Sequence, residues 1–139
     1  MIGHIEALAR LCRQFDIEIL YVFGSRAREV REWVSGPRPS LSPKPTDVDI
    51  GVKASRVLMA RDKVRLSLAL EDLLGATRVD LVLLSDADPF LAANIVRGER
   101  LYARDTYPAD EYDLYVLRRA GDLAPLERER MALILGGSR

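Results

Sequence analysis

The sequence is poor in the side chains that build disulfides, zinc sites and histidine-dependent active sites. It has one cysteine and one histidine in 139 residues, Cys12 and His4. A disulfide scaffold, a zinc finger or ribbon, and a Ser-His-Asp or Cys-His active site within this chain are therefore excluded. Cys12 falls on the apolar side of a predicted helix, where we expect it to be a core residue.

The chain also lacks a long apolar run and an excess of charge of either sign. No apolar segment reaches the roughly 18 residues of a membrane span, and the first residues lack the basic and apolar blocks of a signal peptide. The 21 basic residues balance 21 acidic ones, which argues against binding of duplex nucleic acid through a basic face. We therefore expect one soluble, cytoplasmic domain over residues 1–139, with no membrane partner.

The hydrophobic periodicity predicts an α/β fold without internal repeats. The predicted strands span about residues 17–23, 47–52 and 78–84, with a short strand near Leu101. The predicted helices span about residues 3–15, 25–34, 57–74, 89–97 and 108–135. Ser25 is expected to cap the second helix, and Pro125 is expected to break the last helical region and restart it.

A proline-rich segment, residues 35–46, separates the second predicted helix from the second predicted strand. Its four prolines each fix φ and remove a backbone donor, so neither a helix nor a sheet ladder can run through it. We expect an exposed loop, either a plain surface excursion or a segment that binds a partner. If the loop only decorates the surface, deleting residues 37–43 should leave the melting temperature and partner binding unchanged.

Two aspartates alternate with apolar residues at the start of the second strand. Residues two apart on a strand point the same way, so Asp47 and Asp49 share one face while the valine and isoleucine that follow them face the core. Carboxylates about 5 Å apart repel each other by a few kcal/mol unless a cation or a proton intervenes. Mg²⁺ prefers oxygen ligands and completes its shell with water and substrate phosphates. Asp80, in the next apolar strand, is either a third ligand or the partner of an arginine such as Arg78.

The turn after the first strand has the composition of a phosphate-binding site. Gly24 lets a phosphate approach the backbone, and the helix that follows Ser25 presents free N–H groups to an anion. Arg26 and Arg28 lie where cations oppose the helix dipole, so we expect them to meet phosphate oxygens or acidic partners. Glycine and serine also occur at ordinary strand-to-helix turns, and the two arginines could equally be surface residues paired with nearby glutamates.

Taken together, these segments resemble the DNA polymerase β superfamily of nucleotidyltransferases, and most closely its minimal, MntA-like members. The resemblance rests on three motifs in order: Val22-Phe23-Gly24-Ser25-Arg26-Ala27-Arg28, Thr46-Asp47-Val48-Asp49-Ile50-Gly51-Val52 and Val79-Asp80-Leu81-Val82. It implies an α+β architecture, a small mixed β-sheet flanked by helices, with C-terminal helices over residues 108–135. The family has a shorter connection between the serine and the first aspartate than residues 26–46, and the proline-rich loop accounts for the excess.

The resemblance also implies roles for individual residues. Gly24 and Ser25 would contact the nucleotide phosphates, with Arg26 and Arg28 beside them. The catalytic carboxylates, which would also bind Mg²⁺, would be Asp47, Asp49 and Asp80. Transfer of a nucleotide from a triphosphate would release pyrophosphate.

Minimal members of this family resemble antitoxins that pair with HEPN-domain toxins. The resemblance therefore implies ATP as substrate, Mg²⁺ as cofactor, and a tyrosine of a HEPN-domain toxin as the acceptor of AMP. Two alternatives stay open. One is a non-catalytic antitoxin that neutralises its partner by occlusion, and the other is a nucleotidyltransferase for a small molecule such as an aminoglycoside, with a homo-oligomer completing the site. The short chain favours a protein acceptor, because it leaves no room for an additional acceptor-binding domain.

Overall fold

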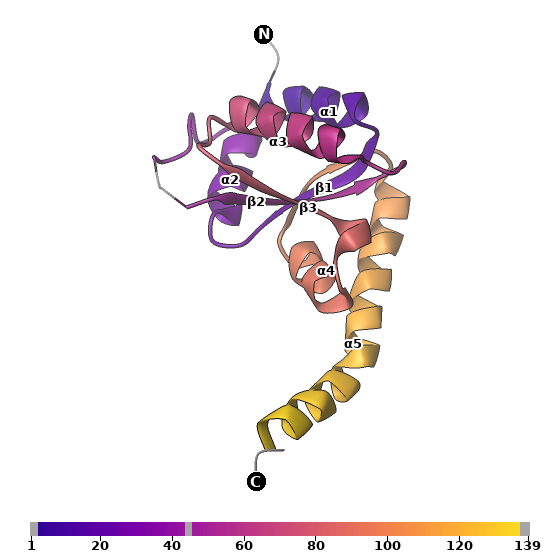
Figure 1. The fold of residues 1–139 in the computed structure, drawn as a ribbon. Coiled ribbons are helices and arrows are strands. Elements are labelled where there is room, and N and C mark those ends of the chain that lie inside the picture. Colours follow the sequence, from indigo (N-terminus) through magenta and orange to yellow (C-terminus); the bar gives the residue numbers. More distant parts are fainter. Residues whose placement is uncertain (1–2, 44–45, 137–139) are drawn as a thin grey trace.

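Four strands form one mixed sheet with helices on both faces in the computed structural model, which describes residues 3–43 and 46–136 (Figure 1). The strands are β1 (Ile17–Phe23), β2 (Val48–Ala54), β3 (Val79–Leu83) and β4 (Glu99–Ala103). Their order across the sheet is β3-β2-β1-β4. β1 is antiparallel to both β2 and β4, whereas β2 and β3 are parallel. The predicted α/β fold with a small mixed sheet is confirmed.

The helices divide between the two faces of this sheet. They are α1 (His4–Gln14), α2 (Ala27–Ser35), α3 (Ala60–Leu74), α4 (Pro89–Val96) and α5 (Thr106–Gly136), and a short 3-10 turn, η1 (Leu84–Asp86), follows β3. In Figure 1, α1, α2 and α3 cover one face, while α4 and the first half of α5 lie on the other. The sheet is therefore the middle layer of the molecule.

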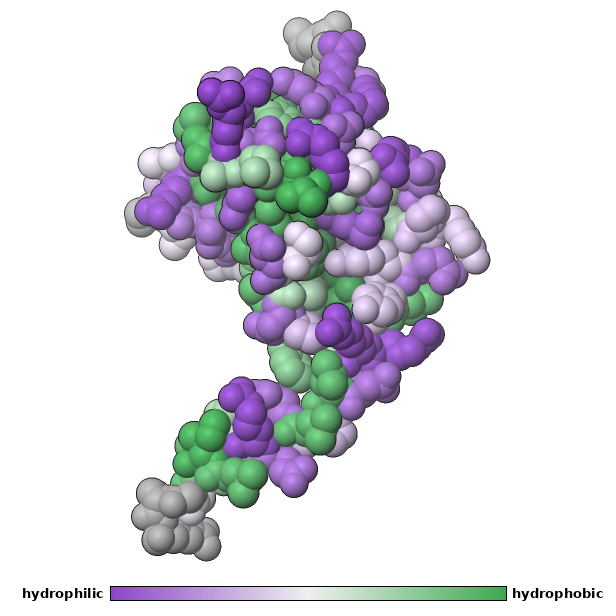
Figure 2. All heavy atoms as spheres, turned by 45° about the vertical axis from the view of Figure 1, so that its right-hand side comes forward, coloured by the Kyte–Doolittle hydropathy of each residue, from purple (hydrophilic) through white to green (hydrophobic). Residues whose placement is uncertain are grey.

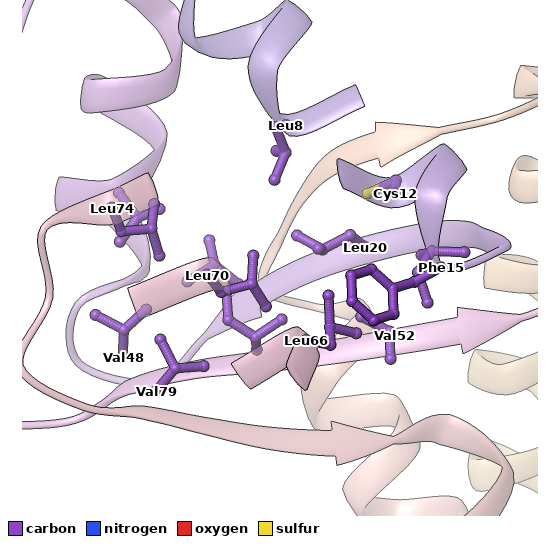
Figure 3. Packing of buried hydrophobic residues seen from close by; sticks show 14 of the residues in the cluster. Leu8, Cys12, Phe15, Leu20, Val48, Val52, Leu66, Leu70, Leu74 and Val79 are labelled. Atoms are coloured by element: carbon purple, nitrogen blue, oxygen red, sulfur yellow. The ribbon is translucent and has the colours of Figure 1, made fainter. Parts of the chain in front are cut away.

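Each face of the sheet carries its own apolar cluster, because the central strand β1 is apolar on both sides. The first cluster, under α1 and α3, includes Leu8, Cys12, Leu20, Leu66 and Leu70 (Figure 3). The second cluster, under α4 and α5, includes Ile19, Tyr21, Phe23 and Ile95. Fully burying one such apolar side chain contributes about 1.5–3 kcal/mol, so these clusters hold the sheet in place. The prediction that Cys12 is a core residue is confirmed.

Two predicted helix starts differ from the structure. α2 begins at Ala27, with Arg26 and not Ser25 at the N-cap position, because the chain first turns at Gly24, which has a φ of +78°. α3 begins at Ala60 and not at residue 57, because Met59 has an extended backbone. The Asp62 carboxylate accepts a hydrogen bond from the Met59 N–H at 3.0 Å and fixes that start. A glycine turn therefore sets the start of α2, and an extended residue with a side-chain cap sets the start of α3.

The last helical region is one helix where the sequence predicted a break. α5 runs for 31 residues with Pro125 inside it. A proline within a helix removes one backbone hydrogen bond and kinks the axis, and Figure 1 shows α5 changing direction without ending. Its buried residues, Ala109, Val116 and Ala120, all belong to the first half. Within the described residues, no helix is both long enough and apolar enough to cross a membrane.

Candidate active site

The three predicted aspartates come together where β2 and β3 begin. Asp49 lies opposite Asp80 in the parallel register of the two strands, so both side chains leave the sheet on the same face. Asp47 directly precedes β2. The pKa of Asp49 is raised, first by burial of its carboxyl and then by the negative charges of Asp80 and Asp47. Asp47, Asp49 and Asp80 therefore form one electrostatic unit, which we call the carboxylate cluster.

The turn at Gly24 and Ser25 meets the carboxylate cluster from the neighbouring strand. Phe23, the last residue of β1, pairs with Asp49 across the sheet. Gly24 follows with a positive φ, and a Cβ built on it would overlap the Asp49 Oδ2 atom. Glycine is the residue that tolerates both this backbone conformation and this close approach. The predicted phosphate-binding turn and the predicted metal ligands are therefore adjacent in space.

A groove of about 440 Å³ continues from this turn. Its lining includes Gly24, Ser25 and Arg28 from the turn and α2, and Asn94 and Arg97 from the end of α4. Asn94 and Arg97 were not predicted as site residues, because nothing in their local sequence pattern marks them and only the packing of α4 brings them to the turn. A second cavity of about 430 Å³, near Lys53, Arg56 and Tyr112, contains none of the predicted site residues.

Arg26 is turned toward the proline-rich loop and does not line the groove. Its side chain is only 3% exposed. Its guanidinium donates hydrogen bonds to the Glu29 carboxylate at 2.9 Å and to the Ser42 carbonyl at 2.7 Å. A third hydrogen bond reaches the Thr46 carbonyl at 3.2 Å. The sequence predicted that Arg26 meets either phosphate oxygens or an acidic partner. In the structure it meets an acidic partner, Glu29.

Glu29 completes this connection between α2 and the loop. Its carboxylate also accepts hydrogen bonds from the Ser42 backbone N–H at 2.5 Å and from the Ser42 hydroxyl at 2.9 Å. Burial by itself would raise the pKa of Glu29, but the hydrogen bonds from Arg26 and Ser42 outweigh it and lower the pKa to about 2. The pair therefore stays ionised and fixes the loop at Thr46, the residue before Asp47.

The proline-rich loop is exposed along most of its described length, as predicted, but Arg38, Leu41 and Ser42 are half-buried. Leu41 packs against the first apolar cluster, and Ser42 is held as described above. The Arg38 backbone N–H donates to the Glu32 carbonyl at 3.4 Å. Residues 44–45 lie outside the described part of the chain. The described part of the loop is thus attached to α2 and to the core.

The donor set of the carboxylate cluster suits Mg²⁺ bound together with a nucleotide. Asp47 is paired with Arg78 at 3.6 Å, so Arg78 is the partner of Asp47 where the sequence had suggested Asp80. Within residues 3–43 and 46–136, no three His, Cys, Asp or Glu side chains are already arranged around a common metal position. Mg²⁺ does not need such an arrangement, because proteins commonly hold it by one or two carboxylates plus substrate phosphates.

Comparison with protein families agrees with this geometry. The family model described as Polymerase beta, Nucleotidyltransferase matches residues 6–107. That range contains all four strands, the turn at Gly24 and the carboxylate cluster. The chain therefore belongs to the polymerase β nucleotidyltransferase family, and the predicted enzyme class is confirmed. Among curated proteins, none matches the sequence.

Solved structures show the same fold. One is a chain in the structure of the tri-AMPylated Shewanella oneidensis HEPN toxin in complex with MNT antitoxin, which is 21% identical with a TM-score of 0.65, over 98% of this chain and 97% of that one. A chain in a toxin–antitoxin structure with AMP-PNP is 22% identical with a TM-score of 0.67, over 97% and 98%. A protein described as a minimal nucleotidyltransferase is 32% identical with a TM-score of 0.52, over 68% and 85%.

Proposed function

We propose that this chain is a Mg²⁺-dependent adenylyltransferase that moves AMP from ATP to a tyrosine hydroxyl of a HEPN-domain toxin, and so acts as its antitoxin. The observation that carries this proposal is the contact between the Gly24 turn and Asp49. The turn can hold phosphates, and Asp49 belongs to a cluster of carboxylates that can hold a cation. Their adjacency provides the two halves of a site for a metal–nucleotide complex.

The residues of the site have separate tasks in this reaction. The backbone at Gly24 and Ser25 binds the β- and γ-phosphates, with Arg28 in the same groove. Asp47 and Asp49 are the ligands of Mg²⁺, which when bound supplies positive charge against the triphosphate. Asp80 lies beside Asp49 on β3 and is exposed, so it can reach an acceptor hydroxyl that arrives from solvent or from a partner.

The transfer itself exchanges one phosphorus–oxygen bond for another. The acceptor oxygen forms a bond to the α-phosphorus while the bond from that phosphorus to the bridging oxygen of pyrophosphate breaks. Asp80 accepts the proton of the hydroxyl, and pyrophosphate leaves with the electron pair of the broken bond. The contribution of the protein is to align the acceptor oxygen with the α-phosphorus and to stabilise the charge that moves to the leaving group.

The nature of the acceptor is supported by the solved structures of similar fold. One of them contains a tri-AMPylated HEPN toxin together with an MNT antitoxin, and another contains AMP-PNP. Both match over at least 97% of this chain. These relatives make AMP the first nucleotide fragment to test and a HEPN-domain protein the first acceptor to test.

The deciding experiment incubates the purified chain with labelled ATP, Mg²⁺ and its candidate HEPN-domain partner, and measures the intact mass of the partner. We expect the mass to rise by one or more AMP groups, with the modified residue located by peptide mapping. Chelation of Mg²⁺, Asp47→Asn and Asp49→Asn should each abolish the mass shift. Asp72→Asn is the matched control, because Asp72 is an exposed aspartate on α3, outside the site.

Three other outcomes of this experiment would each contradict one part of the proposal. A tight complex without any AMP addition contradicts the proposal and favours neutralisation by occlusion. Labelled AMP on a small hydroxyl compound, with no label on the partner, favours small-molecule transfer. AMP addition that survives in Asp49→Asn contradicts the assignment of the carboxylate cluster.

A further inference from the structure

The groove beside the Gly24 turn is also lined by residues that have no role in the proposed reaction. These residues belong to the end of α4, where Asn94 and Arg97 line the same groove as Ser25 and Arg28. Asn94 and Arg97 are three residues apart and therefore lie on the same side of the helix. Both are exposed. A ligand held by the turn would therefore share the groove with these two polar side chains.

The position of Arg97 is set by close packing of the following residue. A Cβ built on Gly98 would overlap the Val22 carbonyl oxygen and lie 2.9 Å from the Phe23 Cβ. The Gly98 backbone N–H also donates to the Ile95 carbonyl at 3.0 Å, and the Arg97 N–H donates to the Ala93 carbonyl at 3.0 Å. Since Phe23 immediately precedes Gly24, the backbone of Arg97 is held next to the phosphate-binding turn.

The charges in the groove favour an anion. Arg97 takes part in no ion pair within the described part of the chain. Arg28 is 92% exposed, and its Nε atom lies 3.6 Å from a carboxylate oxygen of Glu32. Such an exposed ion pair is weak. The acid that lines the groove, Glu99, is itself 3.6 Å from Arg31 on α2. Arg28 and Arg97 are therefore available for an anion in this groove, because the charge of Glu99 is already matched by Arg31.

We propose that Arg97, together with Asn94, completes the polyphosphate site and binds the β- and γ-phosphates of the nucleotide along with Gly24 and Ser25. This inference rests on the proposed function, because it concerns the nucleotide of that same site. The guanidinium of Arg97 offers paired N–H donors that match two phosphate oxygens, and the Asn94 amide adds a neutral donor one helical turn earlier. Contacts from the turn and from α4 hold the leaving pyrophosphate in line with the α-phosphorus.

An arginine at this position could also act on the helix alone, by interacting with the negative end of the α4 dipole. The two roles differ in what they change. A role in the helix affects the melting temperature and weakens every ligand alike. A phosphate contact affects only ligands that have the β- and γ-phosphates.

The test compares Arg97→Gln with the wild type in binding a non-hydrolysable ATP analogue and AMP, each with Mg²⁺, by calorimetry. We expect binding of the ATP analogue to weaken about tenfold, the loss that corresponds to one charged hydrogen-bonding contact. Binding of AMP should change by less than about twofold, and the melting temperature should stay the same. Arg118→Gln is the matched control, because it removes the same charge from an exposed position on α5.

Two results would overturn the inference and leave the proposed function intact. The first is unchanged affinity of Arg97→Gln for the ATP analogue while the wild type binds it. The second is an equal loss for the ATP analogue and AMP together with a lower melting temperature. A wild-type chain that binds no ATP analogue would instead contradict the proposed function, and the polyphosphate role of Arg97 would fall with it.

Discussion

At the scale of single residues, the carboxylate cluster is a place where function and stability oppose each other. Asp49 is half-buried and lies close to two further carboxylates. Without a cation, this charge is less favourable in the folded chain than in the unfolded one. Active sites commonly retain such unfavourable arrangements because the ligand relieves them.

We therefore predict that Asp49→Asn stabilises the protein while abolishing nucleotidyl transfer. In the presence of a chelator, the free energy of unfolding should rise by about 1 kcal/mol, because the amide keeps the shape of the side chain without its charge. Thermal unfolding and the transfer assay measure the two effects separately. Added ATP and Mg²⁺ should raise the melting temperature of the wild type more than that of the variant. A lower melting temperature of Asp49→Asn in chelator would contradict this account.

Arg26 illustrates the opposite case, a charged residue whose task is structural. It is buried and paired with Glu29, so Arg26→Met leaves the largely buried Glu29 carboxylate with its Ser42 hydrogen bonds but without its cationic partner. We expect this variant to lose about 3 kcal/mol of unfolding free energy at neutral pH. Arg28→Met, two residues further along and almost fully exposed, should lose less than about 0.5 kcal/mol. Denaturant unfolding of the two variants tests the contrast.

The same pair predicts how the effect of Arg26→Met depends on pH. The pKa of Glu29 is lowered from 4.5 to about 2 in the folded chain. The stabilisation by the pair is therefore fully present above about pH 4.5 and is lost as the pH falls toward 2, because the unfolded chain takes up the proton first. The difference between wild type and Arg26→Met should shrink over that range. A difference that is constant from neutral pH to about pH 3 would mean that Glu29 is not the partner that matters.

At the scale of elements, the proline-rich loop is exposed along most of its described length but is attached to the protein at two residues. A loop that only decorates the surface could be removed without effect, but this one packs Leu41 on the core and binds Arg26 and Glu29 through Ser42. It also ends directly before Asp47. In the chain, the loop joins the end of α2 to β2. Its contacts with Arg26 and Glu29 also attach it to the start of α2, next to the Gly24 turn.

Deleting residues 37–43 should consequently lower the free energy of unfolding by about 2 kcal/mol, since it removes an apolar contact and several hydrogen bonds to a charged pair. Ser42→Ala should cost about 1 kcal/mol and Ser40→Ala, at an exposed position, close to nothing. Melting temperatures of the three variants provide the measurement. An unchanged melting temperature after the deletion would restore the interpretation of a surface excursion.

At the scale of the whole molecule, the buried residues lie in the sheet and in the helices packed on it. The second half of α5 contributes none of the buried apolar residues. It carries exposed apolar side chains instead, among them Leu126, Leu133, Ile134 and Leu135. Figure 2 shows apolar atoms at this end of the helix, away from the body of the protein.

We predict that removing residues 126–139 leaves the fold and the nucleotide site intact. The melting temperature should change by less than about 2 °C, because residues 126–136, the described part of this segment, include no buried side chain. Binding of the ATP analogue should also be the same as in the full chain. Differential scanning calorimetry and the binding assay test both statements, and a fall of more than about 5 °C would show that this segment stabilises the body.

The sequence alone determined the fold class, the strands and the residues of the carboxylate cluster. These features have local signals: the alternation of apolar residues marks β1, and aspartates in an apolar strand are conspicuous because buried charge is unfavourable. Gly24 could also be predicted, because a glycine between a strand and a helix is a local feature of the sequence. Pro125 shows the limit of local rules, because α5 continues through it.

Only the tertiary structure decided which of these features meet. The antiparallel pairing of β1 with β2 places Gly24 against Asp49. The packing of Gly98 on β1 brings Arg97 to the groove, and the buried contact with Glu29 and Ser42 turns Arg26 away from it. Each of these outcomes depends on atoms that are distant in the chain. Their positions are fixed by the two apolar clusters acting together, and no short stretch of sequence contains that information.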